Sequence, residues 1–150
     1  MVATLEPIAR FKQITGMDAR QAPAAAIEDY EGALASLAHL QDGWDSYGAS
    51  AIDRRQLAAA ARILATLLQP GTPRASLVPT SRGGVQIEWH AEGIDLEIET
   101  LPGFRFAAYF YDDLNEQEWE RELASDWTPL AIAVTELTRR RAKRNVSRGN

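Results

Sequence analysis

The chain has 150 residues, of which 45% are hydrophobic and 25% charged, and its 21 acidic and 16 basic side chains give a net charge of −5. This length and composition predict one globular domain large enough to bury its own core. The absence of cysteine excludes disulfides, thiolate nucleophiles and cysteine-based zinc sites. No apolar run approaches the roughly 20 residues that a membrane helix needs, and the first residues do not resemble a secretory signal, so we expect a cytoplasmic protein.

The N-terminal arm, residues 1–22, has apolar side chains at every third position. These could form one face of a short amphipathic helix, and the stretch after Gly16 is typical of a linker. Two interpretations are open: a loosely packed end of the chain, or a segment that docks onto a partner or a second protomer. The apolar side chains are those of Leu5, Ile8, Phe11 and Ile14.

Two helices are predicted next. The first spans residues 23–41, with Pro23 in its first turn, and ends before Gly43. The second begins near Asp53, whose carboxylate can cap it while Gln56 reaches back, and ends before Pro70. We expect antiparallel neighbours that bury Ile27, Tyr30, Leu34, Leu37 and Gln41 from the first helix and Leu57, Ala60, Ala61, Leu64, Leu67 and Leu68 from the second.

A β-meander is the strongest pattern in the chain. A short edge strand is predicted at 75–79, followed by three strands at 85–90, 94–99 and 104–111 in which every second side chain is apolar. A two-residue loop at Glu92-Gly93 would place Trp89 opposite Leu96 and Ile87 opposite Ile98. A three-residue loop at 101–103 would place Ile98 opposite Phe106 and Glu99 opposite Arg105. Both registers turn the apolar side chains to one face of the sheet.

Two further helices complete the prediction. Asp112 or Asp113 would cap a short acidic helix that carries Leu114, Trp119 and Leu123. Thr128-Pro129 marks the start of a last helix that buries Leu130, Val134 and Leu137 and continues into the arginines. The fold class is therefore α+β: an antiparallel meander of about four strands, packed on one face by the helix pair and the C-terminal helix.

Charge is distributed unevenly along the chain. Residues 139–150 carry six basic and no acidic side chains, so the other 138 residues together carry −11. Between Gln86 and Asp126 there are twelve acidic side chains and two arginines. This distribution, an acidic body with a basic end, divides the chain into the arm at 1–22, a single α+β domain at 23–138 and a basic tail at 139–150.

The loop from Asp42 to Ala49 is one candidate site. Gly43 and Gly48 permit unusual backbone shapes, and Asp42 and Asp45 can bond their own backbone. One interpretation is structural, with Trp44 and Tyr47 folded back over the sheet or the helix pair. The other is a partner-binding tip, because aromatic side chains anchor interfaces.

The polar face of the meander is the second candidate. The predicted register places Glu88 opposite Glu97 and His90 opposite Asp95, with Glu99, Tyr109 and Tyr111 on the same face. Directly opposed like charges destabilise a sheet. The pair could therefore be a carboxylate pair with one raised pKa, a divalent-ion site with His90, or a solvated face. No catalytic or nucleotide-binding motif accompanies it, and we predict no catalytic residue, no metal ligand and no cofactor.

The basic tail has three interpretations. It could be the solvated end of a helix, a protein-binding arm, or a weak and salt-dependent nucleic-acid contact. The acidic body argues against a large nucleic-acid interface, which normally needs a basic face. The residues concerned are Arg139, Arg140, Arg141, Lys143 and Arg144.

Part of the chain resembles a group of small, mostly uncharacterised bacterial proteins. The stretches that carry the resemblance are Gly43-Trp44-Asp45-Ser46-Tyr47-Gly48-Ala49, Pro79, the strand from Gly83 to Trp89, and Leu96-Glu97-Ile98-Glu99. Together they cover about half of the chain, from Leu34 to Tyr111. The resemblance implies an α+β module without an established enzymatic role, of a kind seen among mobile-element and host-conflict genes.

These observations favour a protein-binding module without enzymatic activity. We expect an antitoxin, an immunity protein or a phage-encoded inhibitor whose acidic sheet face engages a basic partner, such as a nucleic-acid-binding toxin or enzyme. The partner-binding residues would be Glu88, Glu97, Glu99, Tyr109, Tyr111, Trp44 and Tyr47. The alternatives are a metal-dependent hydrolase that uses the sheet carboxylates and a small homodimeric DNA-binding regulator that uses the tail.

Overall fold

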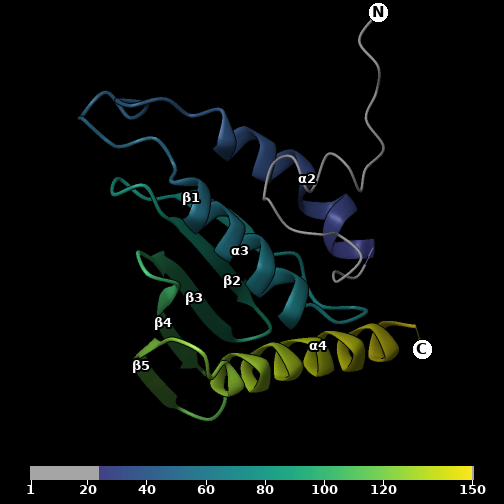
Figure 1. The fold of residues 1–150 in the computed structure, drawn as a ribbon. Coiled ribbons are helices and arrows are strands. Elements are labelled where there is room, and N and C mark those ends of the chain that lie inside the picture. Colours follow the sequence, from purple (N-terminus) through teal and green to yellow (C-terminus); the bar gives the residue numbers. More distant parts are fainter. Residues whose placement is uncertain (1–23, 150) are drawn as a thin grey trace, which may run out of the picture.

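The computed structural model describes residues 24–149, and side chains from Asp29 onward (Figure 1). The predicted arm at 1–22 and the side chain of Ile27 lie outside the described residues. Eight elements follow one another: α2 (Ala24–Ala38), α3 (Arg54–Leu67), β1 (Ser76–Pro79), β2 (Val85–Ala91), β3 (Ile94–Leu101), β4 (Arg105–Asp112), β5 (Gln117–Leu123) and α4 (Thr128–Arg148).

The α+β class is confirmed, with five strands where about four were predicted. The strands form one antiparallel sheet in the order β1-β2-β3-β4-β5. The three helices lie on one side of this sheet (Figure 1), and the core fills the space between the two layers. The opposite side of the sheet, which we call the outer sheet face, is covered by none of the described elements (Figure 1). No helix in the described part of the chain has the length and apolarity to cross a membrane.

Buried and outward-facing side chains alternate along the strands as predicted. β3 is buried at every second position from Ile94 to Thr100, and β2 pairs with it in the predicted register, with Trp89 opposite Leu96. The β3–β4 register differs by two residues, because the loop is Pro102-Gly103-Phe104 rather than 101–103. Ala108 therefore lies opposite Ile98. A shift of two keeps every side chain on its predicted face.

The predicted acidic helix after Tyr111 is wrong. Residues 117–123 form β5, which pairs with β4 and places Trp119 opposite Phe110. The four-residue spacing of Trp119 and Leu123 fits a helix, but it is also a multiple of the two-residue period of a strand. Here the strand period holds, because Glu118, Glu120 and Glu122 alternate with the inward residues.

The helix pair is joined to the sheet by buried polar groups. Asp53 caps α3 as predicted, accepting hydrogen bonds from the amides of Arg55 and Gln56. Gln56 does not reach back to the start of α3 as predicted. Its Oε1 instead accepts a 3.0 Å hydrogen bond from the Thr100 hydroxyl, and the same hydroxyl accepts a hydrogen bond from the Val85 amide. This chain fixes the angle of α3 over the sheet.

The predicted buried stripes are confirmed at most positions. Tyr30, Leu34 and Leu37 of α2 are buried, whereas Gln41 lies beyond the helix and is exposed. In α3 the stripe from Leu57 to Leu67 is buried, and Leu68 is half-buried. Leu130, Val134 and Leu137 of α4 are buried as expected.

Candidate functional site

The outer sheet face is organised in rows that cross the sheet. The strand registers align Glu88, Glu97, Tyr109 and Glu120 in one row. Two parallel rows flank it and contain His90, Asp95, Tyr111 and Glu118 on one side and Gln86, Glu99, Ala107 and Glu122 on the other. The five predicted partner-binding residues of the sheet therefore do lie on one face.

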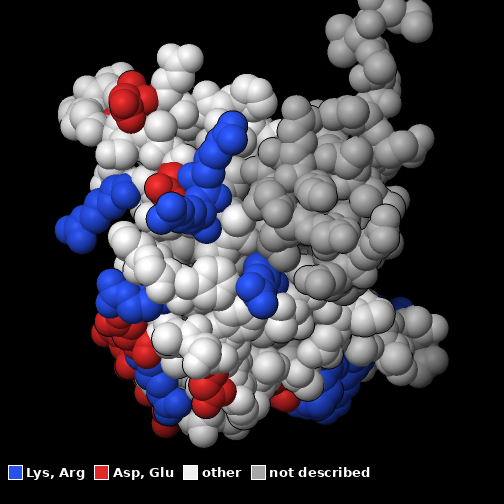
Figure 2. All heavy atoms as spheres, viewed as in Figure 1, with Lys and Arg blue, Asp and Glu red and all other residues white. Residues whose placement is uncertain are grey.

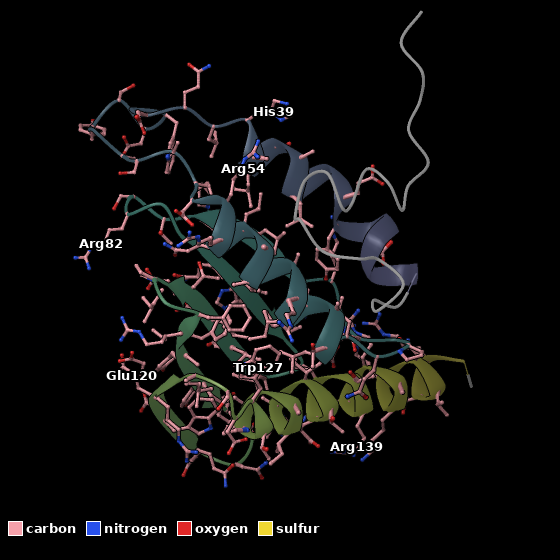
Figure 3. The ribbon with its side chains drawn as sticks, in the orientation of Figure 1. His39, Arg54, Arg82, Glu120, Trp127 and Arg139 are labelled. Atoms are coloured by element: carbon pink, nitrogen blue, oxygen red, sulfur yellow. The ribbon has the colours of Figure 1, made fainter. Side chains whose placement is uncertain are left out.

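β5 extends this face with three carboxylates that the sequence interpretation missed. Glu118, Glu120 and Glu122 were assigned to a helix, and their period of two was the pattern that could have placed them on the sheet. With Glu88, Asp95, Glu97 and Glu99 they make seven acidic side chains on the outer sheet face, beside one arginine, Arg105, which pairs with Glu122. Figure 3 shows Glu120 pointing away from the helix layer, whereas Trp127 lies on the side of the helices.

The middle of the outer sheet face contains a shallow hollow. A hollow of about 120 Å³ is bordered by residues from four strands, including Glu97, Glu99, Tyr109 and Glu120. The Tyr109 hydroxyl donates a 2.9 Å hydrogen bond to Glu118 Oε1, and this bond raises the pKa of Tyr109. Two tyrosines thus lie among the carboxylates, Tyr111 being directed toward Asp113.

His90 is held between carboxylates. Its Nδ1 lies 2.7 Å from Asp95 Oδ1 and its Nε2 lies 3.4 Å from Glu88 Oε2. The hydrogen bond with Asp95, with a smaller contribution from Glu88, raises the pKa of His90. A protonated ring neutralises part of the acidic face at this corner.

Three side chains of the face could together hold a metal ion. Ligand atoms of Glu88, His90 and Glu97 lie within 4.8 Å of one another. The carboxylates are suitable oxygen donors, but a metal would have to displace the proton that Asp95 and Glu88 favour on His90.

The loop at Asp42–Ala49 is stabilised by its own polar groups. Asp45 Oδ1 accepts hydrogen bonds from the amides of Tyr47 and Ala49, at 2.8 and 3.0 Å, and the Trp44 indole donates to the Ser50 carbonyl. Trp44 is half-buried, but Tyr47 is 93% exposed, so it does not fold back as the structural interpretation expected. Trp44 and Tyr47 belong to this loop and not to the sheet strands.

The basic tail is the second half of α4. The Arg140 guanidinium makes two hydrogen bonds to the Asp112 carboxylate, at 2.7 and 3.0 Å, and a third to the Glu92 carbonyl. Arg141 and Arg144 both contact Glu92 Oε1, at 2.6 and 2.9 Å. Three of the five residues proposed for nucleic-acid contact are therefore engaged in fastening α4 to the β2–β3 and β4–β5 turns, which leaves Arg139 and Lys143 as the better candidates for that role. Figure 2 shows basic side chains at the lower right, and acidic side chains interleaved with basic ones at the lower left, over β5.

The Asp112 carboxylate makes the free energy of unfolding depend on pH in the acidic range. Its hydrogen bonds with Arg140 lower its pKa from 3.8 to about 2. A depressed pKa in the folded state stabilises the protein above about pH 4, and this contribution of about 2 kcal/mol disappears as the pH falls toward 2. We expect urea melts of Asp112→Asn to lose that part of the pH slope, whereas Asp113→Asn, which changes an exposed neighbour, keeps it. An unchanged slope in Asp112→Asn would contradict the assignment.

No protein-family model, curated protein sequence or solved structure matches this chain.

Proposed function

We propose that this protein is a non-enzymatic binding module whose outer sheet face engages a basic surface of another protein. The observation that supports the proposal most is the concentration of seven carboxylates and two tyrosines on a sheet face that the described helices leave open. An antitoxin, an immunity protein or a phage-encoded inhibitor acting in the cytoplasm would use such a face against a nucleic-acid-binding enzyme or toxin.

Electrostatics supports a binding role for the face. A cluster of one sign creates a potential that attracts an oppositely charged surface and accelerates association. A partner that normally binds nucleic acid carries the clustered lysines and arginines that fit this potential. Tyr109 and Tyr111 supply rigid apolar surface among the charges, as anchors of interfaces do.

The directly opposed pair Glu88 and Glu97 supports a binding role, because it lowers the stability of the free sheet but would favour a cationic partner. Like charges directly across a strand pair destabilise a sheet, and within the described part of the chain the only cation that contacts either carboxylate is His90, beside Glu88. If a cationic partner occupies the face, the repulsion is relieved only in the complex. A face without a partner would gain from neutralising Glu97, whereas neutralising Glu88 would also weaken its contacts with Gln86 and His90.

Substituting Glu97→Gln tests this proposal. We expect the free energy of unfolding to rise by about 0.2–1 kcal/mol, because the repulsion with Glu88 is removed. We expect capture of basic proteins from an extract of the source cell to fall at the same time. Thermal melts and quantitative mass spectrometry of the captured proteins measure the two effects.

Asp29→Asn is the matched control, because it removes one exposed carboxylate on α2. It should leave both stability and capture near the wild-type values. If Glu97→Gln stabilises the protein but captures the same proteins in the same amounts, the face is only a solvated surface and the proposal fails.

A further inference from the structure

We propose that the free edge of β5 accepts an extended segment of the partner as an additional strand, and that this segment alternates apolar and cationic side chains. The inference rests on the proposed function for the basic character of the partner. The inference specifies the edge of the module that binds the partner and the extended conformation of the bound segment.

β5 is an unpaired edge of seven residues. It is the last strand in the sheet order and pairs on one side only, with β4, and none of the described residues bonds to its other side. An edge of this kind presents amide and carbonyl groups that can pair with another chain. The opposite edge, β1, has only four residues and ends in Pro79, so it offers fewer such groups.

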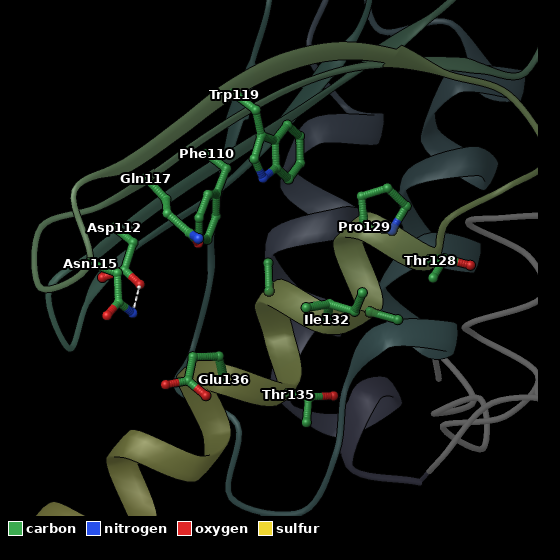
Figure 4. A pocket seen from close by; sticks show the side chains of 12 residues that line it. Phe110, Asp112, Asn115, Gln117, Trp119, Thr128, Pro129, Ile132, Thr135 and Glu136 are labelled. Atoms are coloured by element: carbon green, nitrogen blue, oxygen red, sulfur yellow. Dashed lines mark hydrogen bonds between the residues drawn. The ribbon is translucent and has the colours of Figure 1, made fainter.

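An apolar groove lies beneath this edge. It has a volume of about 630 Å³ and runs between the inner side of β4–β5 and the first turns of α4 (Figure 4). Phe110 and Trp119 stack with ring centroids 5.4 Å apart on the sheet side. Pro129 and Ile132 face them from α4 (Figure 4), and Ile132 is 65% exposed.

The two sides of β5 differ in chemistry, and this difference defines the ligand. Toward the helices β5 presents Trp119, with the Arg121 guanidinium over its ring, beside the apolar groove, while toward the outer sheet face it presents Glu118, Glu120 and Glu122. A strand added beside β5 would turn successive side chains to opposite sides. Its inward residues would meet the groove and its outward residues would meet the carboxylates, so an apolar–cationic alternation fits both sides.

A second copy of β5 does not fit this edge. Antiparallel pairing of two β5 strands about Glu120 would place that residue opposite its own copy and Glu118 opposite Glu122. Each of these pairs joins two like charges, which destabilises a sheet. The same carboxylates that repel a second copy attract lysine or arginine, which favours a different, basic chain as the occupant.

The test uses two capped heptapeptides of identical composition and the full-length protein. In one peptide lysine alternates with leucine, and in the other the lysines precede the leucines. We expect the alternating peptide to bind about tenfold more tightly, because only it can direct leucines into the groove while its lysines face the glutamates. On binding, amide hydrogen exchange should slow in β5 and stay unchanged in β1.

Two exposed substitutions locate the binding site. Ile132→Arg places a cation in the groove and Glu120→Lys reverses the middle charge of the row, so each should weaken the alternating peptide about tenfold. Glu97→Lys, which makes the same charge change on a central strand, should weaken it less than either. Circular dichroism confirms that each variant is folded.

Equal affinity of the two peptides, slowed exchange outside β5, or no binding would overturn the inference. Such a result would leave the proposed function intact if Glu97→Gln still reduced capture of basic proteins. Conversely, unchanged capture by Glu97→Gln would refute the acidic-face proposal without affecting the peptide measurements. The two failures are therefore distinguishable.

Discussion

We expect Arg140→Met to lower the free energy of unfolding by about 3–5 kcal/mol, the usual effect of removing one partner of a buried ion pair. The Arg140 side chain is 8% exposed and the Asp112 side chain 3% exposed. Without the guanidinium, the Asp112 carboxylate keeps two donors in the described part of the chain, the Leu114 amide and the Asn115 side chain. For a chain of this size the change corresponds to a fall in melting temperature of roughly 10 °C.

The neighbouring arginine provides the control. Arg139 is 58% exposed, and among the described residues it pairs only with Glu136, one turn earlier on the same helix. Surface pairs of this kind contribute about 0–1 kcal/mol, so Arg139→Met should melt close to wild type. Equal melting temperatures for the two variants would show that Arg140 does not fasten α4 to the sheet.

The double variant Arg140→Met/Asp112→Asn isolates the interaction itself. Since Asp112→Asn removes the buried charge that Arg140→Met leaves unpaired, the double variant should be less destabilised than the sum of the single variants. This result matters for the DNA-binding alternative. Deleting residues 139–150 would remove Arg140 and unfold part of the domain, so Arg139→Glu/Lys143→Glu is the cleaner test of a nucleic-acid contact.

Strand alternation made most of the sheet predictable. Wherever polar and apolar side chains alternated strictly, as from Ile94 to Glu99, the strand and its faces were confirmed. The β2–β3 register was also predictable, because a two-residue turn at Glu92-Gly93 permits one pairing, and both residues have the positive φ that this turn requires. The β3–β4 loop was harder to predict, because the alternation that Phe104 shares with Phe106 favours an inward strand position for it. It instead occupies the turn with a φ of 58°.

The two remaining misses have different causes, one a contact between distant segments and the other an ambiguous period. The helix phase of Leu130, Val134 and Leu137 separates Arg140 and Arg141 from Arg139, but only the position of Asp112, 28 residues away, selects Arg140 for the buried ion pair. β5 was missed because Trp119 and Leu123 fit two periods equally well. That miss hid three of the seven carboxylates of the outer sheet face, so the sequence alone underestimated the candidate site.

The second large effect should be seen in association kinetics. We expect Glu88→Lys/Glu97→Lys to slow binding of the most enriched captured protein by about 10–1000-fold at low salt, because the variant reverses the field at the middle of the outer sheet face. The difference from wild type should shrink as salt rises, since a Debye length of about 8 Å at physiological ionic strength screens exposed charges. Stopped-flow or surface-plasmon measurements at several salt concentrations give the rates.

A control with the same net charge separates the local field from the total charge. Asp29→Lys/Gln41→Lys/Ser81→Lys adds the same four units at exposed positions outside the sheet strands. If total charge governed association, both variants would bind equally slowly. If the rows of carboxylates govern it, the control should bind at nearly the wild-type rate. The double reversal also removes the contact of Glu88 with His90, its one cationic neighbour among the described residues. Circular dichroism must therefore show a folded sheet before the slow rate is assigned to the lost field.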